Sequence, residues 1–199
     1  MPSPSAAEEH LRVIRSLMEK ATIYRAISAQ AALVAGSIAC GVGFLIPKMG
    51  SSSNFVWRWF AVLAVSAAVN FYFLHRDARR RGEPFVSAGM RMALRAMWPP
   101  LVCGGVVAFI FPAGWIVPFW LMFYGLALLS TVHFAPRSLE RLGYVFLSCG
   151  LVALAMDTYV RASLILPPDR LMAVTFGLLH IVYAACTWPR TQPVVRAES

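Results

Sequence analysis

Long apolar runs separated by short charged segments dominate the chain. The longest, residues 96–136, contains no Asp, Glu, Lys or Arg, and Pro112-Ala113-Gly114 interrupts it near its middle. A bilayer core about 30 Å thick needs about 20 residues of helix. The run is therefore long enough for two spans, and we expect a helical hairpin that turns at Pro112-Ala113-Gly114.

Similar apolar runs elsewhere in the chain predict six transmembrane helices, arranged as three hairpins. Their expected bounds are 26–47, 56–75, 96–112, 115–134, 139–157 and 171–189. The fifth is short between Arg141 and Asp157, so it spans a bilayer only if both charged side chains extend to the headgroups. The expected fold class is an all-α membrane protein with one transmembrane domain, residues 26–189.

An amphipathic helix is expected in residues 1–25, before the first span. Ser5 and Glu8 have the spacing of a capping box, which favours a helix start. The apolar residues that follow recur at helical spacing; they are Leu11, Ile14, Leu17, Met18 and Ala21. Such a helix either lies in the membrane interface or docks on the bundle or on a partner protein, and the sequence leaves these alternatives open.

Positive charge is unevenly distributed between the predicted connections. Most of the 18 Lys and Arg residues fall on the N-terminal segment, on the second and fourth connections and on the tail at 190–199. The opposite side keeps Lys48, Arg58, Arg161 and Arg170. Because short loops rich in Lys and Arg stay cytoplasmic, we expect both termini inside. This topology accounts for the net charge of +9, so no nucleic-acid partner is expected.

The most charged stretch, residues 75–84, is predicted to be the cytoplasmic loop after the second span. An interfacial helix is expected next, over residues 87–98, and Pro99-Pro100 predicts a break or kink before the third span. The arginines of this region are candidates for binding anionic lipid headgroups or a cytoplasmic partner. They are Arg76, Arg79, Arg80, Arg81, Arg91 and Arg95.

His180 falls near the middle of the sixth predicted span. An ionisable group at that depth is costly and is expected to face the bundle interior. A neutral imidazole bonded to Ser, Thr, Tyr or a backbone carbonyl would only fix helix packing. The functional alternative is a proton or ligand pathway through His180, Tyr183 and Asn70. Polar residues such as Ser28 and Asn70 are otherwise explained by interhelical hydrogen bonds.

Three further histidines are expected near the cytoplasmic surface. His75 and His133 end the second and fourth predicted spans, and His10 lies on the N-terminal helix. Together they form a weak candidate metal site, because the chain lacks the close ligand spacing of recognisable zinc motifs. No cofactor is otherwise expected.

Each odd-numbered span carries a Cys-Gly pair. The pairs are Cys40-Gly41, Cys103-Gly104 and Cys149-Gly150. Small residues favour close helix packing in membranes, so one hypothesis is a threefold hairpin repeat with these pairs on an inner seam; coincidence is the alternative.

Signatures of common enzyme classes are missing from the sequence. It has no Gly-x-Ser-x-Gly, no His-Glu-x-x-His and no Walker loop. With nine acidic residues, none deep in a span, metal-assisted phosphoryl chemistry has few ligands. An enzyme is therefore not the favoured class, and no catalytic residue is assigned.

Three segments carry a resemblance to a known group of proteins. Residues 10–25 (HLRVIRSLMEKATIYR), Arg81-Gly82-Glu83-Pro84-Phe85 and Trp98-Pro99-Pro100 resemble segments of small multi-pass bacterial inner-membrane proteins of unassigned function. The resemblance implies a bacterial plasma membrane. It implies no substrate, cofactor or catalytic residue.

The favoured functional hypothesis is a non-catalytic membrane protein. It would act as a scaffold, sensor or accessory subunit that engages lipid or a cytoplasmic partner through the N-terminal helix and the arginine-rich loop. The alternative is a small oligomeric transporter or channel with His180 in the pathway. The third hypothesis is a haem-binding or metal-binding membrane protein.

Overall fold

The computed structural model describes residues 8–14, 28–45, 52–82, 86, 88–133, 135–159 and 166–188, and within them the structure is helical without strands. The main helices are α2 (Ala29–Leu45), α3 (Ser52–Arg81), α4 (Ala88–Ile110), α5 (Ala113–Leu129) and α6 (Arg137–Tyr159). The last helical rod combines α7 (Pro168–Met172), a π-helical segment η1 (Ala173–Leu178) and α8 (Leu179–Thr187). A helical segment at 8–14 precedes them. The remainder of the expected N-terminal helix and the tail at 190–199 lie outside the described residues.

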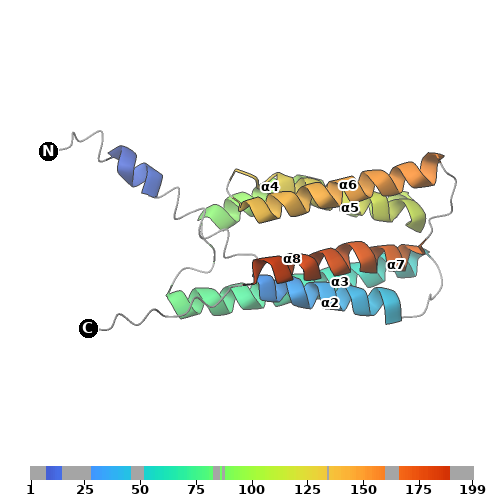
Figure 1. Ribbon diagram of the computed structural model, residues 1–199, viewed down its shortest axis with the longest axis horizontal. Helices are drawn as coiled ribbons and strands as arrows, with labels where there is room; N and C mark the ends of the chain where they lie inside the picture. Colours follow the sequence, from blue (N-terminus) through green and yellow to red (C-terminus); the bar gives the residue numbers. More distant parts are fainter. Residues whose placement is uncertain are drawn as a thin grey trace.

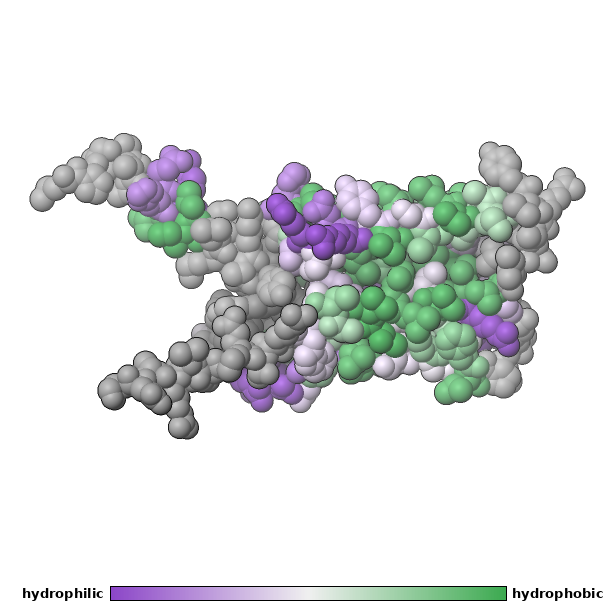
Figure 2. All heavy atoms as spheres, in the orientation of Figure 1, coloured by the Kyte–Doolittle hydropathy of each residue, from purple (hydrophilic) through white to green (hydrophobic). Residues whose placement is uncertain are grey.

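Four of the helices are long and apolar enough to cross a membrane. These stretches are Asn54–Arg80, Met90–Ile110, Arg137–Met156 and Pro168–Thr187, while Ala29–Leu45 and Gly114–Leu129 are shorter apolar helices. Figure 2 shows apolar residues covering the middle of the molecule, with hydrophilic residues toward its two ends. Large exposed apolar side chains such as Leu63 and Val152 point outward from this middle zone. A surface of this kind indicates a membrane protein.

The described helices from α2 to α8 form two layers (Figure 1). One layer contains α2, α3 and the α7–η1–α8 rod, and the other contains α4, α5 and α6. The last rod therefore packs on the first long helix of the described chain, although they are far apart in sequence. The second layer is built from consecutive helices.

Glycines bring the helix backbones into direct contact within each layer. A Cβ atom on Gly36 of α2 would lie 2.7 Å from the carbonyl oxygen of Gly177 in η1. In the other layer, a Cβ on Gly125 of α5 would lie 2.7 Å from the carbonyl oxygen of Gly143 in α6. Both distances are too short for any side chain, so close packing within the layers requires glycine at these positions.

Aromatic rings fill the space between the layers. Trp120 of α5 packs against Phe55 and Phe60 of α3, with ring centroids 6.0 and 5.7 Å apart. Farther along, Phe146 of α6 packs against Phe176 of η1 at 5.0 Å. We call this group the aromatic seam; its members are Phe55, Phe60, Trp120, Tyr124, Phe146, Phe176 and His180.

The predicted loop after the second span is wrong for most of its length. Residues 75–81 are the last turns of α3, which has 30 residues. Basic side chains stabilise the negative pole at a helix C-terminus, so arginines continue this helix rather than end it. Gly82, with φ of 66°, adopts the left-handed conformation that commonly follows a helix end.

Of the break or kink predicted at Pro99-Pro100, the break does not occur. The expected interfacial helix and the third span are one continuous helix, α4, with both prolines inside it. The two prolines remove the backbone donors for the carbonyls of Arg95 and Ala96. These carbonyls lie on the charged side of the prolines, where water and headgroups are accessible to satisfy them.

Other helix ends differ from the predicted bounds for local reasons. Ser28 forms no interhelical bond with another described residue; its hydroxyl oxygen accepts a hydrogen bond from the N–H of Ala31 at 3.1 Å and caps the start of α2. Helix α5 ends at Leu129, several residues early, and the hydroxyl of Thr131 donates to the carbonyl of Leu128 in the turn that follows. Helix α6 runs for 23 residues, of which Arg137–Met156 is long and apolar enough to cross a membrane, although Arg141 lies inside this stretch and Asp157 follows it.

The three Cys-Gly pairs do not form a common seam. A Cβ on Gly41 would have no neighbour within 4 Å, and Cys103 is exposed. Helical geometry gives the reason, since Gly36, Cys40 and Gly43 recur at intervals of four and three residues and share one face. Gly41 is rotated by about 100° from Cys40 and therefore points away from the packed face.

The two kinds of glycine on α2 should respond oppositely to alanine. Gly36→Ala should destabilise the protein by about 1–3 kcal/mol because its methyl group overlaps η1. Gly41→Ala should be neutral or stabilise it by up to about 1 kcal/mol, since alanine favours the helix and nothing is crowded. Denaturant unfolding in detergent, followed by circular dichroism, measures both. Equal stability of the two variants would contradict glycine-mediated packing.

Candidate functional site

His180 lies inside the bundle and joins the two layers. Its Nδ1 is 2.6 Å from the carbonyl oxygen of Phe176, and its Nε2 is 2.9 Å from the hydroxyl of Tyr124. A carbonyl only accepts, so we assign the ring proton to Nδ1, and in the neutral ring Nε2 accepts from the Tyr124 hydroxyl. A protonated ring would keep both contacts, with the tyrosine oxygen accepting instead. This pair is a candidate site that holds a proton or fixes the layers together.

Aromatic rings enclose the His180–Tyr124 pair. The ring of Phe146 meets Tyr124 edge-on at 4.8 Å and lies 5.5 Å from His180. The Phe176 ring stacks at 6.3 Å from the imidazole. An apolar ring cluster of this kind disfavours a charged imidazole, so the surroundings support the packing role over proton transfer.

The π-helical turn next to His180 redirects backbone carbonyls. The Ala173 carbonyl oxygen in this wider turn faces α2. It accepts a hydrogen bond from the thiol of Cys40, with a distance of 3.5 Å between Sγ and the oxygen. The hydroxyl of Thr175 donates to the Leu171 carbonyl at 2.7 Å. Single π-helical turns within α-helices occur frequently at functional sites, which keeps this region a candidate.

The structure brings together only part of the predicted pathway. Tyr183 is buried on α8, one turn from His180. Asn70 is half-buried on α3 and has no hydrogen bond with His180 or Tyr124 in the described part of the chain. Tyr124 was not anticipated as the partner of His180. Its signal was its position, because it is the one tyrosine of the charge-free run at 96–136.

A second polar site lies at the opposite end from most arginines. The Nη2 of Arg58 is 2.5 Å from Oδ1 of Asp169, and the indole of Trp59 donates to the same oxygen at 2.9 Å. The Arg58 and Asp169 side chains are 17% and 15% exposed. This partly buried ion pair ties the start of α3 to the start of α7.

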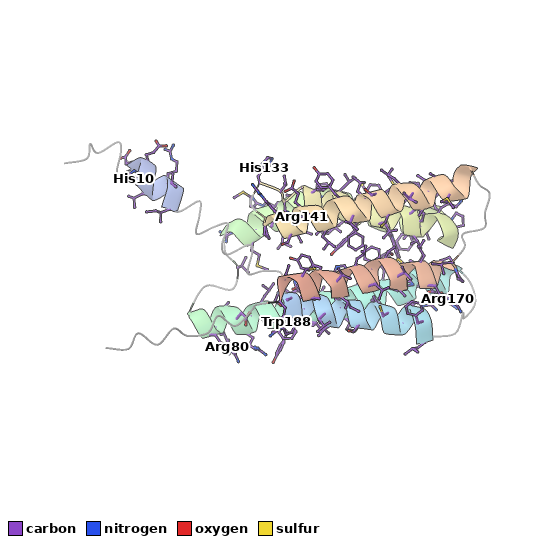
Figure 3. All side chains as sticks on the ribbon, viewed as in Figure 1. His10, Arg80, His133, Arg141, Arg170 and Trp188 are labelled. Carbon is purple, nitrogen blue, oxygen red and sulfur yellow. The ribbon has the colours of Figure 1, made fainter. Side chains whose placement is uncertain are left out.

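The remaining described arginines of the bundle, apart from Arg170, gather at one end. Figure 3 shows Arg80 and Arg141 toward this end and Arg170 at the other. We call the group the arginine cluster; its members are Arg76, Arg79, Arg80, Arg91, Arg95, Arg137 and Arg141. All except Arg76 are exposed, and in the described part of the chain none of them forms an ion pair. Arg76 is half-buried and covers the ring of Phe73 at 5.5 Å. The side chain of Arg81 lies outside the described part.

The three histidines of the weak metal site are on separate elements. His10 lies on segment 8–14, His75 on α3 and His133 in the turn after α5, and all three are exposed. Figure 3 shows His10 and His133 apart from each other. Among the residues that the structure describes, no three His, Cys, Asp or Glu side chains gather as metal ligands would.

Comparison with protein-family models, curated proteins and solved structures gives no match. The resemblance to bacterial inner-membrane proteins therefore stays a prediction. The function has to be argued from the geometry of the residues.

Removal of the Tyr124 hydroxyl should weaken the link between the layers. Tyr124→Phe should cost about 0.6–1.7 kcal/mol, the range for an interhelical hydrogen bond in a membrane protein. In a His180→Leu background the same change should cost much less, because its partner is absent. Tyr144→Phe, at an exposed tyrosine of α6, is the matched control. Unfolding in detergent measures all four variants, and a Tyr124→Phe cost that His180→Leu does not reduce would contradict the link.

Proposed function

We propose that the protein is a non-catalytic, six-span membrane protein with both termini in the cytoplasm. Its arginine cluster and its N-terminal amphipathic helix form a cytoplasmic platform that engages the lipid surface or a cytoplasmic partner. In this role it is a scaffold, sensor or accessory subunit of the bacterial inner membrane.

Six spans are supported by the lengths and directions of the helices. The two shorter apolar helices, α2 and α5, have 17 residues each, or about 25 Å of helix. That length is at the lower limit for a span and suffices with slight local thinning of the bilayer. The antiparallel order then gives three pairs of consecutive spans that start and end on the same side. The third pair is not a packed hairpin as predicted, because α6 and the α7–η1–α8 rod lie in different layers.

The arginine cluster supports a cytoplasmic location for that end. The exposed members lie on α3, α4 and α6 at one end, whereas Arg58 at the other end is neutralised by Asp169. Positive charge retained on one side is typical of the cytoplasmic face. The same charges attract anionic headgroups electrostatically.

The main observation in support of the proposed platform is the exposed apolar face of segment 8–14. Leu11 and Ile14 are 66% and 52% exposed, so this face does not dock on the described bundle. Of the alternatives left by the sequence, the interface or a separate partner is favoured over the protein's own bundle.

The alternative functions gain less support. Both ring nitrogens of His180 are engaged within an aromatic cluster, which favours fixed packing over a transport path. The histidines proposed for a metal lie on three elements. Transport and metal or haem binding stay predictions.

Reporter fusions test the proposed topology. Alkaline phosphatase joined after residue 50 or 163 should be active, because these points would lie outside the cytoplasm, where its disulfides form. Fusions after residue 84, 135 or 199 should be inactive, and fluorescent-protein fusions at the same points should show the reverse pattern. An active phosphatase after residue 84 would contradict the orientation.

A polarity-sensitive fluorophore tests the platform in the full-length protein. In a cysteine-free background, a label at Ile14→Cys should shift to the blue in vesicles that contain phosphatidylglycerol, because this face inserts at the interface. A label at Glu9→Cys, on the polar face, is the control, and its emission should stay at the wavelength typical of an aqueous environment. If cytoplasmic extract is required for the Ile14 shift, the platform binds a protein. A label at Ile14 that reports water under both conditions would overturn the proposed platform.

A further inference from the structure

Five residues of α4 form one continuous stripe. Arg91, Arg95, Trp98, Val102 and Gly105 follow one another at intervals of four, three, four and three residues. On an α-helix this spacing places all five on one face. The four side chains are exposed, Trp98 to 68%, and Gly105 is half-buried. We call these residues the α4 stripe.

The two arginines of the stripe have no compensating charge among the described residues. In the described residues neither has an ion pair, and the first turn of α4 contains no acidic residue. Like charges four residues apart repel, and Arg91 lies near the positive pole of the helix. An anion between the guanidinium groups would relieve both effects.

Arginines at the end of α3 are in the opposite situation. Arg79 and Arg80 carry the same charge and are also exposed, but they occupy the last turn of their helix. There the helix dipole stabilises positive charge. The two sites therefore differ in their need for an anion although their side chains are the same.

Trp98 carries an indole N–H donor in the next turn of the α4 stripe. In the described residues its indole N–H has no acceptor, whereas that of Trp120 donates to the carbonyl of Gly104 at 2.9 Å. Exposed tryptophans concentrate at the level of headgroups and ester groups. The donor is therefore placed for an ester or phosphate oxygen of a lipid.

Gly105 leaves open space beside α4. A Cβ there would meet no atom within 4 Å, although glycine within a helix costs about 1 kcal/mol relative to alanine. Its neighbour Gly104 is different, since a Cβ there would lie 3.3 Å from Phe123. From Trp98 to Gly105 the helix rises about 10 Å, which is about two thirds of one leaflet of a 30 Å bilayer core. This part of the stripe is therefore long enough to follow most of one acyl chain.

We propose that the α4 stripe binds one anionic phospholipid of the cytoplasmic leaflet. The phosphate lies between Arg91 and Arg95, the ester region meets the Trp98 indole, and an acyl chain follows Val102 and Gly105. This assignment rests on the proposed function for its orientation in the membrane. A second copy of the chain is the less favourable occupant, because symmetric α4–α4 packing in one membrane would bring the same two arginine pairs together.

Lipid retention by the full-length protein tests the site. The probes are phosphatidylglycerol and phosphatidylcholine in mixed micelles, with bound lipid counted by native mass spectrometry. R91Q/R95Q should weaken phosphatidylglycerol binding by about tenfold and leave phosphatidylcholine unchanged. R79Q/R80Q, the comparison with equal charge change, should weaken phosphatidylglycerol binding by no more than about twofold through the general field.

A third variant tests the apolar part of the site. Gly105→Leu adds a side chain where a Cβ atom would meet no atom within 4 Å, so the protein should be at least as stable as the parent. It should reduce retention of both lipids, because the leucine displaces the acyl chain.

Each other outcome overturns the site. Equal losses from both arginine pairs would reveal only a general basic surface. A dimer in the spectra that Gly105→Leu dissociates would assign the stripe to a second copy. The phosphatase fusions and the Ile14 label test the topology and the platform separately from lipid retention. Results that contradict the proposed platform are therefore distinguishable from results that contradict the lipid site.

Discussion

Direct backbone contact at glycines is the constraint on which the rest of the structure depends. Lipid is as apolar as leucine, so transmembrane helices gain little from hydrophobic burial and associate through close packing and interhelical hydrogen bonds. Gly36 against Gly177, and Gly125 against Gly143, set the separation and rotation of the helices in each layer. The rotation of the last rod then decides that His180 faces Tyr124. The polar link between the layers is thus a consequence of packing elsewhere.

The sequence predicted helices well and their pairing poorly. Charge-free runs are a strong signal because each charge in lipid is costly, and they located the apolar helices and the interior position of His180. The end of α3 and the continuity of α4 were predicted wrongly, because a helix near a membrane surface can continue through arginines and prolines. Tyr124 and the π-helical turn could not be found from spacing alone. They depend on which faces of distant helices meet, and Gly36 and Gly41 are indistinguishable until α8 is in place.

The partners of the polar groups differ between the middle of the molecule and its two ends. In the middle, the imidazole and phenol satisfy each other inside an aromatic seam. At one end, Arg58 is neutralised by Asp169 and held by it against α7. At the other end, the exposed arginines have no partner among the described residues. Among the described residues, most of the exposed positive charge without an ion pair gathers at this end, so interaction with an anion outside the chain is most favourable there.

The layer that contains α2, α3 and α8 also has a consequence for biosynthesis. Its central contact joins residues 36 and 177, so the glycine face of α2 has no native partner until nearly the whole chain has left the ribosome. The layer of α4, α5 and α6 consists of neighbours and can assemble as each hairpin enters the bilayer. Chains emerge at about 5–20 residues per second. The glycine face of α2 therefore stays uncovered for several seconds until η1 and α8 are made. During that interval α2 is exposed to other membrane helices and to quality-control proteases, and synthesis of η1 and α8 ends the exposure.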